Sequence, residues 1–204
     1  MPVTINGSGS IAGLAVGGLP DGSVDADTLA SNAVSSDKLP TSSILKVFNQ
    51  TLTAGASYSV TNQYQAGNSI AWVDTAFDLT CNLSRSASNK ILIMGTISIG
   101  EGTGGDVHVF LYKDGSVLSG AIGQAVGNNT RSTSGLSCGR SAWDTQTTPV
   151  FYMETAGDTS SHTYKITAMA TNTSIALNRQ QNNNQNMDND NSHISYITAM
   201  EVKG

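Results

Sequence analysis

Apolar and polar residues alternate in short segments from Ile44 to the end of the chain. The segments are rich in β-branched and aromatic residues and are bounded by turn residues, a pattern typical of strands. They are SILKVF with NQTLT, SIAWVD, AFDLTCNL, KILIMGTISI, DVHVFLYK, SVLSGAI, STSGLSCGRSAW, TPVFYME, HTYKITAMA, TSIALN and HISYITAMEV. Asp114-Gly115 predicts a two-residue hairpin, because glycine accepts the positive φ of a type I′ turn. No long amphipathic helix is expected here.

This pattern predicts an all-β fold, an antiparallel β-sandwich of the jelly-roll type over residues 44–204, in which alternate residues of facing strands make the core. The residues expected in the core or in an interface are Ile91, Ile93, Val107, Val109, Tyr164, Ile166, Tyr196 and Ile197.

Residues 22–43 follow another pattern, two decads in which Val24 and Leu29 recur as Val34 and Leu39. A single helix does not explain this spacing, because five residues turn it by about 500° and spread the apolar positions around its surface. A single strand fails too, since an odd spacing sends valine and leucine to opposite faces. The pattern indicates a compound repeat, with valine in a short extended piece and leucine on one helical turn, which Asp25 or Ser35 could cap.

Such a repeat buries too little apolar surface to offset a backbone entropy cost of about 1–2 kcal/mol per residue, so one copy alone is expected to be disordered. Several copies around a common axis would share one apolar seam. An ordinary flexible linker remains the alternative. Residues 1–21 are glycine-rich and carry isolated apolar side chains that would suit docking on a larger assembly, or would stay mobile; those assigned to docking are Val3, Ile5, Ile11 and Leu14.

The composition narrows the classes of function. The chain has 204 residues, a formal net charge of −5 and only 12% charged residues, so no basic surface for nucleic acid is expected. No apolar run is long enough to cross a membrane, and the first residues lack a signal-peptide pattern; we therefore expect no membrane insertion and no secretion by the usual route. Cys81 and Cys138 could form one disulfide, but two buried free thiols are the preferred interpretation.

The sequence contains no strong indication of a catalytic site. The stretch GLSCG at residues 135–139 matches G-x-S-x-G, but a nucleophile elbow needs a strand, a sharp turn and a helix, and the residues around this match read as strand. The three histidines share no metal-ligand spacing, so neither a metal nor a cofactor is expected. Asp144, Glu154 and Asp158 are the carboxylates that could cleave a glycosidic bond, as in any β domain of this size. We expect no enzyme.

Ten of the fourteen residues from 178 to 191, NRQQNNNQNMDNDN, are asparagine or glutamine. Such side chains can hydrogen-bond a sugar or line a wet interface, although an ordinary solvated loop explains them as well. Trp143 beside Asp144 could form an aromatic platform for a sugar, or be an ordinary core residue. The candidate receptor-binding residues are Trp143, Asp144, Arg179, Asn183 and Asn184.

The opening stretch TINGSGSIAGLAVGGLPDGSVDADTLASNAVSSDKL resembles the N-terminal and shaft modules of phage tail fibres, particularly those of cyanophages and other aquatic phages. The elements SIAWVDTAFDLT, SNKILIMGTISI, TSSHTYKITAMA, SIALNR and SYITAMEV resemble the compact β head at the C-terminal end of such fibres.

This resemblance implies a homotrimer in which Val24, Leu29, Val34 and Leu39 line a threefold axis. It divides the chain into a docking segment (1–21), a short shaft (22–43) and a β head (44–204). The N-terminus would attach to a phage tail or baseplate protein, and the head to a host surface glycan or protein. The protein would be made in the host cytoplasm and reside in the virion. A capsid decoration, cement or baseplate protein without a host receptor is the alternative.

Overall fold

The computed structural model describes residues 4–5, 11–12, 29, 31, 33–53, 56–59, 78–82, 86–101, 105–127, 130–138, 145–170, 174–180 and 192–204. The chain divides into two compact units, Met1–Leu39 and Pro40–Gly204. Among the described residues, strands and two short 3-10 turns account for all regular structure.

The first unit contains two short strands, β1 (Thr4–Ile5) and β2 (Ile11–Ala12), which pair antiparallel. A single 3-10 turn, η1 (Ser36–Lys38), comes directly before Leu39, where one helical turn was expected. Ser35 precedes this turn but makes no side-chain capping bond, so the expected hydroxyl cap is wrong; the turn is closed by the Lys38 N–H donating to the Ser35 carbonyl at 3.0 Å.

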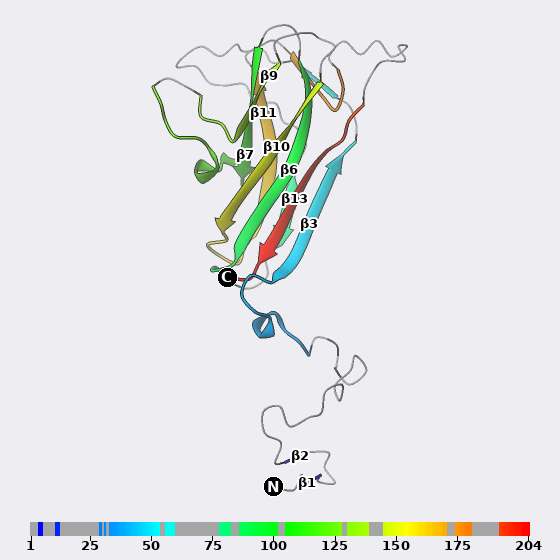
Figure 1. The fold of residues 1–204 in the computed structure, drawn as a ribbon, viewed down its shortest axis with the longest axis vertical. Helices are drawn as coiled ribbons and strands as arrows, with labels where there is room; N and C mark the ends of the chain where they lie inside the picture. Colours follow the sequence, from blue (N-terminus) through cyan, green and yellow to red (C-terminus); the bar gives the residue numbers. More distant parts are fainter. Residues whose placement is uncertain are drawn as a thin grey trace. The chain divides into compact units, whose positions relative to one another are not determined.

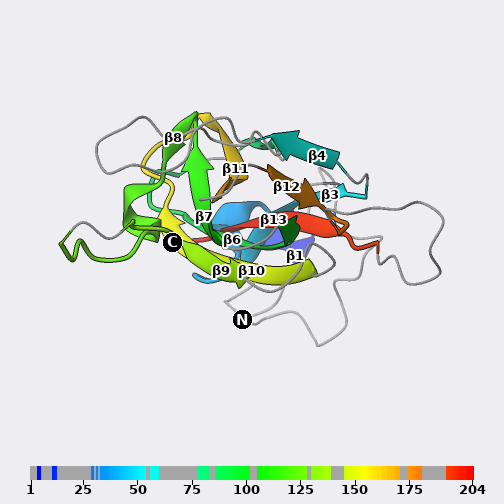
Figure 2. The ribbon, with the colours of Figure 1, turned by 90° about the horizontal axis from the view of Figure 1, so that it is seen from above.

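The second unit is a sandwich of two antiparallel sheets (Figures 1 and 2). One sheet holds β3 (Ile44–Leu52), β13 (Ser195–Val202), β6 (Lys90–Glu101), β10 (Thr145–Thr155), β12 (Ser174–Leu177) and β4 (Ala56–Ser59). The other holds β5 (Leu79–Asn82), β11 (Ser161–Ala170), β7 (Gly105–Lys113), β8 (Ser116–Val117) and β9 (Ser134–Cys138). A 3-10 turn, η2 (Ser119–Ala121), follows β8.

The strand pairs are nested. β3 pairs with β13, β5 with β11, β6 with β10, and β7 with β8 and β9. This is the connectivity of a jelly roll, one long hairpin rolled up so that its strands are shared between two sheets. The antiparallel β-sandwich predicted from the alternation is thereby confirmed.

The pairing register defines two ends of the sandwich. Ile44 pairs with Val202, and Val202 with Lys90, at what we call the near end, which the chain enters from Pro40. Leu52 pairs with Ser195 at the opposite, far end. β6 also ends there, because Gly100 pairs with Thr145 and Glu101 with Ile175.

In the second unit one predicted strand is shorter than expected, one strand was missed, and one prediction is not tested. SVLSGAI forms only the two residues of β8 before turning into η2. β4 was not predicted, because alanine, serine and one tyrosine give a weak strand signal. The predicted strand SIAWVD lies outside the described residues.

The predicted Asp114-Gly115 hairpin is confirmed. Both residues have positive φ, 50° and 79°, and Lys113 pairs with Ser116 across the turn. These are the signs of φ that a type I′ turn requires at its two central positions.

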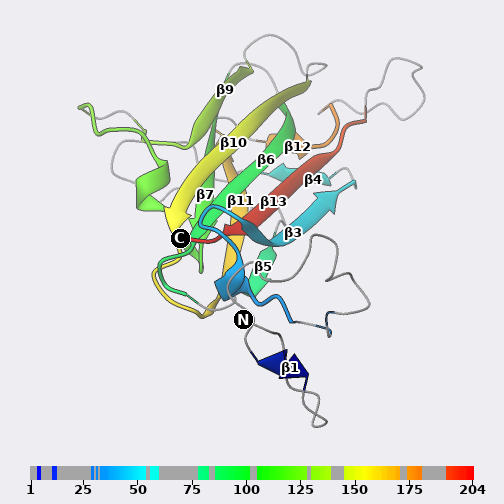
Figure 3. The same cartoon turned by 60° about the horizontal axis from the view of Figure 1, so that its bottom comes forward.

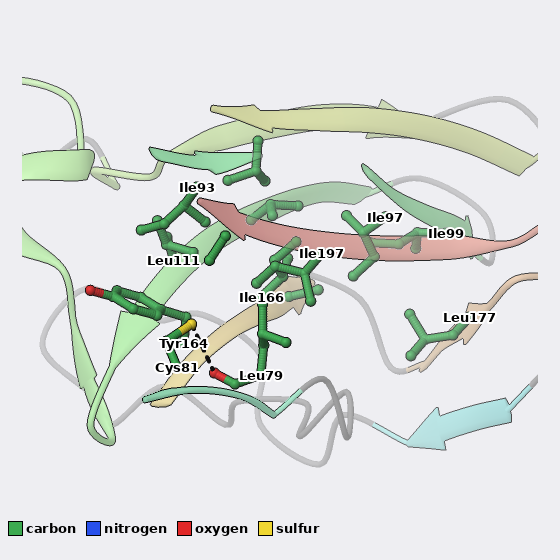
Figure 4. Packing of buried hydrophobic residues seen from close by; sticks show 14 of the residues in the cluster. Leu79, Cys81, Ile93, Ile97, Ile99, Leu111, Tyr164, Ile166, Leu177 and Ile197 are labelled. Carbon is green, nitrogen blue, oxygen red and sulfur yellow. Dashed lines mark hydrogen bonds between the residues drawn. The ribbon is translucent and has the colours of Figure 1, made fainter. Parts of the chain in front are cut away.

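The core is made by alternate residues of β6 and by the strands that face it (Figure 4). Seven of the eight residues expected in the core or in an interface are no more than 1% exposed, and the eighth, Tyr196, is 37% exposed. Tyr196 and Ile197 are neighbours in one strand, so their side chains point to opposite faces, and Ile197 is the one that points inward.

Gly95 interrupts the inward-facing isoleucines of β6 for a steric reason. A Cβ atom there would lie 2.4 Å from the Tyr196 carbonyl oxygen and 3.0 Å from Cδ1 of Ile166. The missing side chain lets Ile166 of the other sheet pack directly against the β6 backbone.

A polar junction stabilises β6 where its partner strand changes from β13 to β12. There the Ser98 N–H donates to Ser195 Oγ at 2.9 Å, and the Ser98 carbonyl accepts from the Asn178 N–H at 2.9 Å. Ser195 Oγ donates to Asn178 Oδ1 at 2.5 Å, and Asn178 Nδ2 donates to the Leu52 carbonyl at 2.7 Å. Asn178 has a φ of 56°, which asparagine tolerates better than most residues. The junction therefore satisfies backbone groups that the change of strand would leave unpaired.

Candidate interaction face

The side of β10, β6, β13 and β3 that points away from the core forms a continuous surface, since these strands lie side by side (Figure 3). The pairing register arranges it as four rows across four strands, sixteen positions that we call the outer face. From the near end the rows are Thr155–Lys90–Val202–Ile44, Met153–Leu92–Met200–Val47, Phe151–Met94–Thr198–Asn49 and Pro149–Thr96–Tyr196–Thr51.

The outer face is mostly apolar, with ten of its sixteen side chains from Val, Ile, Leu, Met, Phe, Tyr or Pro. Its second row has only apolar residues, from Met153, 48% exposed, to Val47, 57% exposed. In the next row Phe151 is 67% exposed beside Met94. A solvated sheet face usually carries polar residues at such positions, so this face departs from the normal alternation.

Several polar groups of the outer face bond to one another. Its single charged residue, Lys90, donates from Nζ to Thr155 Oγ1 at 2.7 Å. Asn49 Nδ2 donates to Thr198 Oγ1 at 2.7 Å. The face therefore offers a partner mainly apolar contact.

The outward side of the other sheet is different. Phe110 of β7 and Met169 of β11 point away from the core, yet they are only 3% and 1% exposed. Apolar side chains on that side are covered by the chain itself, whereas those of the outer face are not.

The outer face covers about 19 Å by 27 Å, or roughly 500 Å², from the spacing of strands and of alternate residues. A typical monomer has a largest apolar patch of about 300–600 Å², which is often functional. The outer face, polar positions included, is therefore as large as the largest apolar patch of a typical monomer, and a patch of that size is often functional.

A signal for this face was present in the sequence. KILIMGTISI, which forms most of β6, has four consecutive apolar residues, Ile91 to Met94, after its first residue, Lys90, instead of alternating. Such a run is typical of a strand buried on both faces. The sequence does not reveal which strands continue the rows, because that depends on the register.

Of the five candidate receptor-binding residues, the structure describes Arg179. It is half-buried and pairs with Ser192 in an isolated antiparallel bridge. The other four lie outside the described residues: Trp143, Asp144, Asn183 and Asn184.

Among the four shaft positions, Leu29 and Val34 are 44% and 56% exposed, Leu39 is partly buried, and Val24 lies outside the described residues. Among the docking positions, Ile5 pairs with Ile11. Val3 and Leu14 lie outside the described residues.

Ser137 of the G-x-S-x-G match lies inside β9, where it pairs with Asp106 of β7, whereas the serine of a nucleophile elbow lies at a sharp turn between a strand and a helix. Gly139, the last residue of the match, lies outside the described residues. In the described parts of the chain, no group of three or more His, Cys, Asp or Glu side chains is arranged to hold a metal ion. Neither 3-10 turn described here approaches the length that a membrane-spanning helix needs.

Two of the three candidate catalytic carboxylates, Glu154 and Asp158, make separate structural contacts. Glu154 accepts a short hydrogen bond from the Tyr164 hydroxyl and lies 2.9 Å from Lys113 Nζ. Burial, with help from Glu154, raises the pKa of Tyr164 well above its usual range. Asp158 contacts His162, and Asp144 lies outside the described residues.

His162 joins two turns at the near end. Its Nδ1 lies 2.7 Å from Asp114 Oδ2, and its Nε2 lies 3.1 Å from Asp158 Oδ1. Burial opposes ionisation of Asp114, but the Thr163 N–H and His162 lower the pKa of this carboxyl overall. The Ser160 N–H, assisted by His162, lowers the pKa of Asp158. An ionised carboxylate can only accept a hydrogen bond. The two contacts of His162 can therefore both be hydrogen bonds only when both of its ring nitrogens carry a proton.

Cys81 is a free, buried thiol, as the preferred interpretation of the sequence had it. Burial, and to a lesser degree the charge of Glu201, raises its pKa to about 12. Its Sγ lies 3.9 Å from the Leu79 carbonyl oxygen, to which it donates a weak hydrogen bond (Figure 4). The side chain of Cys138 lies outside the described residues.

Comparison of the sequence with protein-family models and with curated proteins finds no match. Among solved structures, the fold is similar to a chain from the "Structure of infectious bursal disease virus Gx strain", with 15% identity and a TM-score of 0.38. The similarity covers 77% of this chain and 36% of that chain, so the chain spans about a third of its structural neighbour. A likeness of this size says nothing about function.

Proposed function

We propose that this chain is a virion structural protein, a homotrimeric short tail fibre of a phage. Its N-terminal segment attaches to a tail or baseplate protein, and its β-sandwich attaches to a glycan or protein of the host surface. It acts without catalysis and without a cofactor.

The observation that carries this proposal is the exposed apolar spacing of residues 22–43. Leu29 and Val34 are about half exposed in a single chain, five residues apart, within a stretch of otherwise small and polar residues. Three copies around an axis would cover these side chains, as in the phage fibres that this stretch resembles.

The two ends of the sandwich support the proposal that the N-terminal segment attaches to the virion and the sandwich attaches to the host. The chain enters at the near end, where the Ser42 N–H donates to the Lys203 carbonyl at 2.8 Å. The described residues that flank both candidate receptor segments, Thr145 for one and the bridged pair Arg179 and Ser192 for the other, lie at the far end. Three far ends on one fibre would bind several receptors at once, so weak individual contacts would sum to stable attachment.

The first test is immunogold electron microscopy of intact particles with antibodies against residues 45–204. Label at the tail is expected. Label spread over the capsid would reject the fibre and favour a decoration protein that does not meet the host.

A second test concerns attachment itself. The purified full-length protein is expected to bind host cells and to compete with infection, and Arg179→Ala is expected to weaken that binding severalfold. Binding unchanged by this substitution would remove Arg179 from the receptor site. Release of reducing sugar from host polysaccharide by the purified protein would contradict the absence of catalysis.

A further inference from the structure

We infer that the outer face is the surface through which three copies of this chain pack against one another in the region Pro40–Gly204. This inference rests on the proposed homotrimer and assigns to it a contact surface. It goes beyond the shaft seam, which involves other residues.

The chemistry of the outer face favours an apolar partner. A glycan site needs many hydrogen-bonding groups around an aromatic platform, whereas ten of the sixteen positions here are apolar, and Asn49 and Lys90 each bond to a neighbouring threonine. A charged partner would find one lysine among sixteen positions. Methionine and aliphatic side chains suit a protein surface that is equally apolar. A second copy of this chain has such a surface, because it carries the same outer face.

Chain connectivity favours a second copy over another virion protein. β3, the outermost strand of the face, begins at Ile44, five residues after Leu39, the last apolar residue of the second decad. Five residues span at most about 18 Å. Any axis that gathers three shafts therefore brings the first residues of three β3 strands, and with them one corner of each outer face, to within about that distance of the shafts.

The size of the face is consistent with this arrangement. About 800 Å² per partner is standard for a stable complex of two proteins. The outer face alone, roughly 500 Å² by strand spacing, falls short of that for one isolated contact. In a trimer it would combine with the shaft seam, and three symmetric copies would close without leaving a free apolar edge.

The chain contains its own probes for a test. Met153 is 48% exposed in a single chain, whereas Met169 is 1% exposed because the fold itself buries it. The full-length protein would be treated with hydrogen peroxide, and sulfoxide formation at each methionine would be followed by mass spectrometry, alongside sedimentation to measure the oligomeric state.

In the trimer, we expect Met153 to oxidise about as slowly as Met169, and to become at least tenfold faster on dilution below the dissociation constant. A trimer in which Met153 oxidises quickly would overturn this inference and leave the proposed fibre standing. A chain that is monomeric at all concentrations would overturn both.

A pair of variants isolates the face. Val47→Lys places a charge in its apolar row, and Val126→Lys makes the same change at a similarly exposed valine, 61% against 57%, in the loop before β9. With circular dichroism showing both folded, Val47→Lys is expected to weaken the trimer at least tenfold and to expose Met153, while Val126→Lys stays within twofold of wild type. Equal trimer stability in the two variants would contradict the assignment.

Discussion

Replacing Ser195 by alanine is expected to destabilise the sandwich strongly, although it removes a single oxygen atom. Ser195 is fully buried, and its hydroxyl serves two partners at once, accepting from the Ser98 N–H and donating to Asn178 Oδ1. Both partners are about 1% exposed, so water cannot easily replace the hydroxyl.

The magnitude follows from the groups that lose their partner. A buried donor or acceptor left unsatisfied costs about 1–3 kcal/mol. Two such groups, Ser98 N–H and Asn178 Oδ1, give an expected loss of about 2–4 kcal/mol once some local relaxation is allowed for. The junction links β6, β13 and β3 at the far end only. The variant is therefore expected to lose free energy of unfolding while it keeps the same fold.

The assay is urea unfolding of wild type and variant at one protein concentration, because self-association shifts apparent stability. The control is Ser161→Ala, the same substitution at an exposed hydroxyl that donates to Asn82 Oδ1 at 2.8 Å, where the expected change is within about 0.5 kcal/mol. The midpoint should fall for Ser195→Ala at an unchanged m-value. A loss for Ser195→Ala no larger than that of the control would refute the role given to the junction.

Three further predictions rest on other parts of the fold. Gly95→Ala is expected to cost about 1–3 kcal/mol, because the new Cβ meets the Tyr196 carbonyl, while Gly123→Ala, with open space around it, should be close to neutral in the same unfolding assay. The carboxylates that contact His162 have lowered pKa values, so their contribution is present above the usual carboxyl pKa and is lost as pH falls through the lowered values. His162→Asn should therefore flatten the dependence of stability on pH below about pH 4, where carboxyl groups ordinarily titrate, and an unchanged slope would argue against the contact. Because its pKa is near 12, Cys81 should resist iodoacetamide at pH 8 in the folded protein and react after unfolding, as peptide mapping would show.

Much of the sandwich could be predicted, because most of its strands show a clear alternation of apolar and polar residues over a short stretch of sequence. The alternation of HTYKITAMA predicts Tyr164 and Ile166 on one face, and both are fully buried. The Asp114-Gly115 turn is local in sequence, so its geometry needs no tertiary information.

The candidate face could not be predicted, because it depends on which strands become neighbours. Met153 and Val47 share a row only through the register of four strands that are far apart in sequence. The assignment of Tyr196 was ambiguous for a related reason. Where both faces of a sheet carry apolar residues, alternation no longer tells which face meets the core.

The pairing of the first and last strands has a mechanical consequence. β3 runs from the near end to the far end, and eight residue pairs join it to β13. A pulling force between Pro40 and the far end would run parallel to these strands, so the hydrogen bonds of the ladder would be sheared together instead of being broken one after another. The sandwich is thus suited to carry tension from its entry point to its opposite end along the ladder of β3 and β13, and a force applied across the strands would open it far more easily.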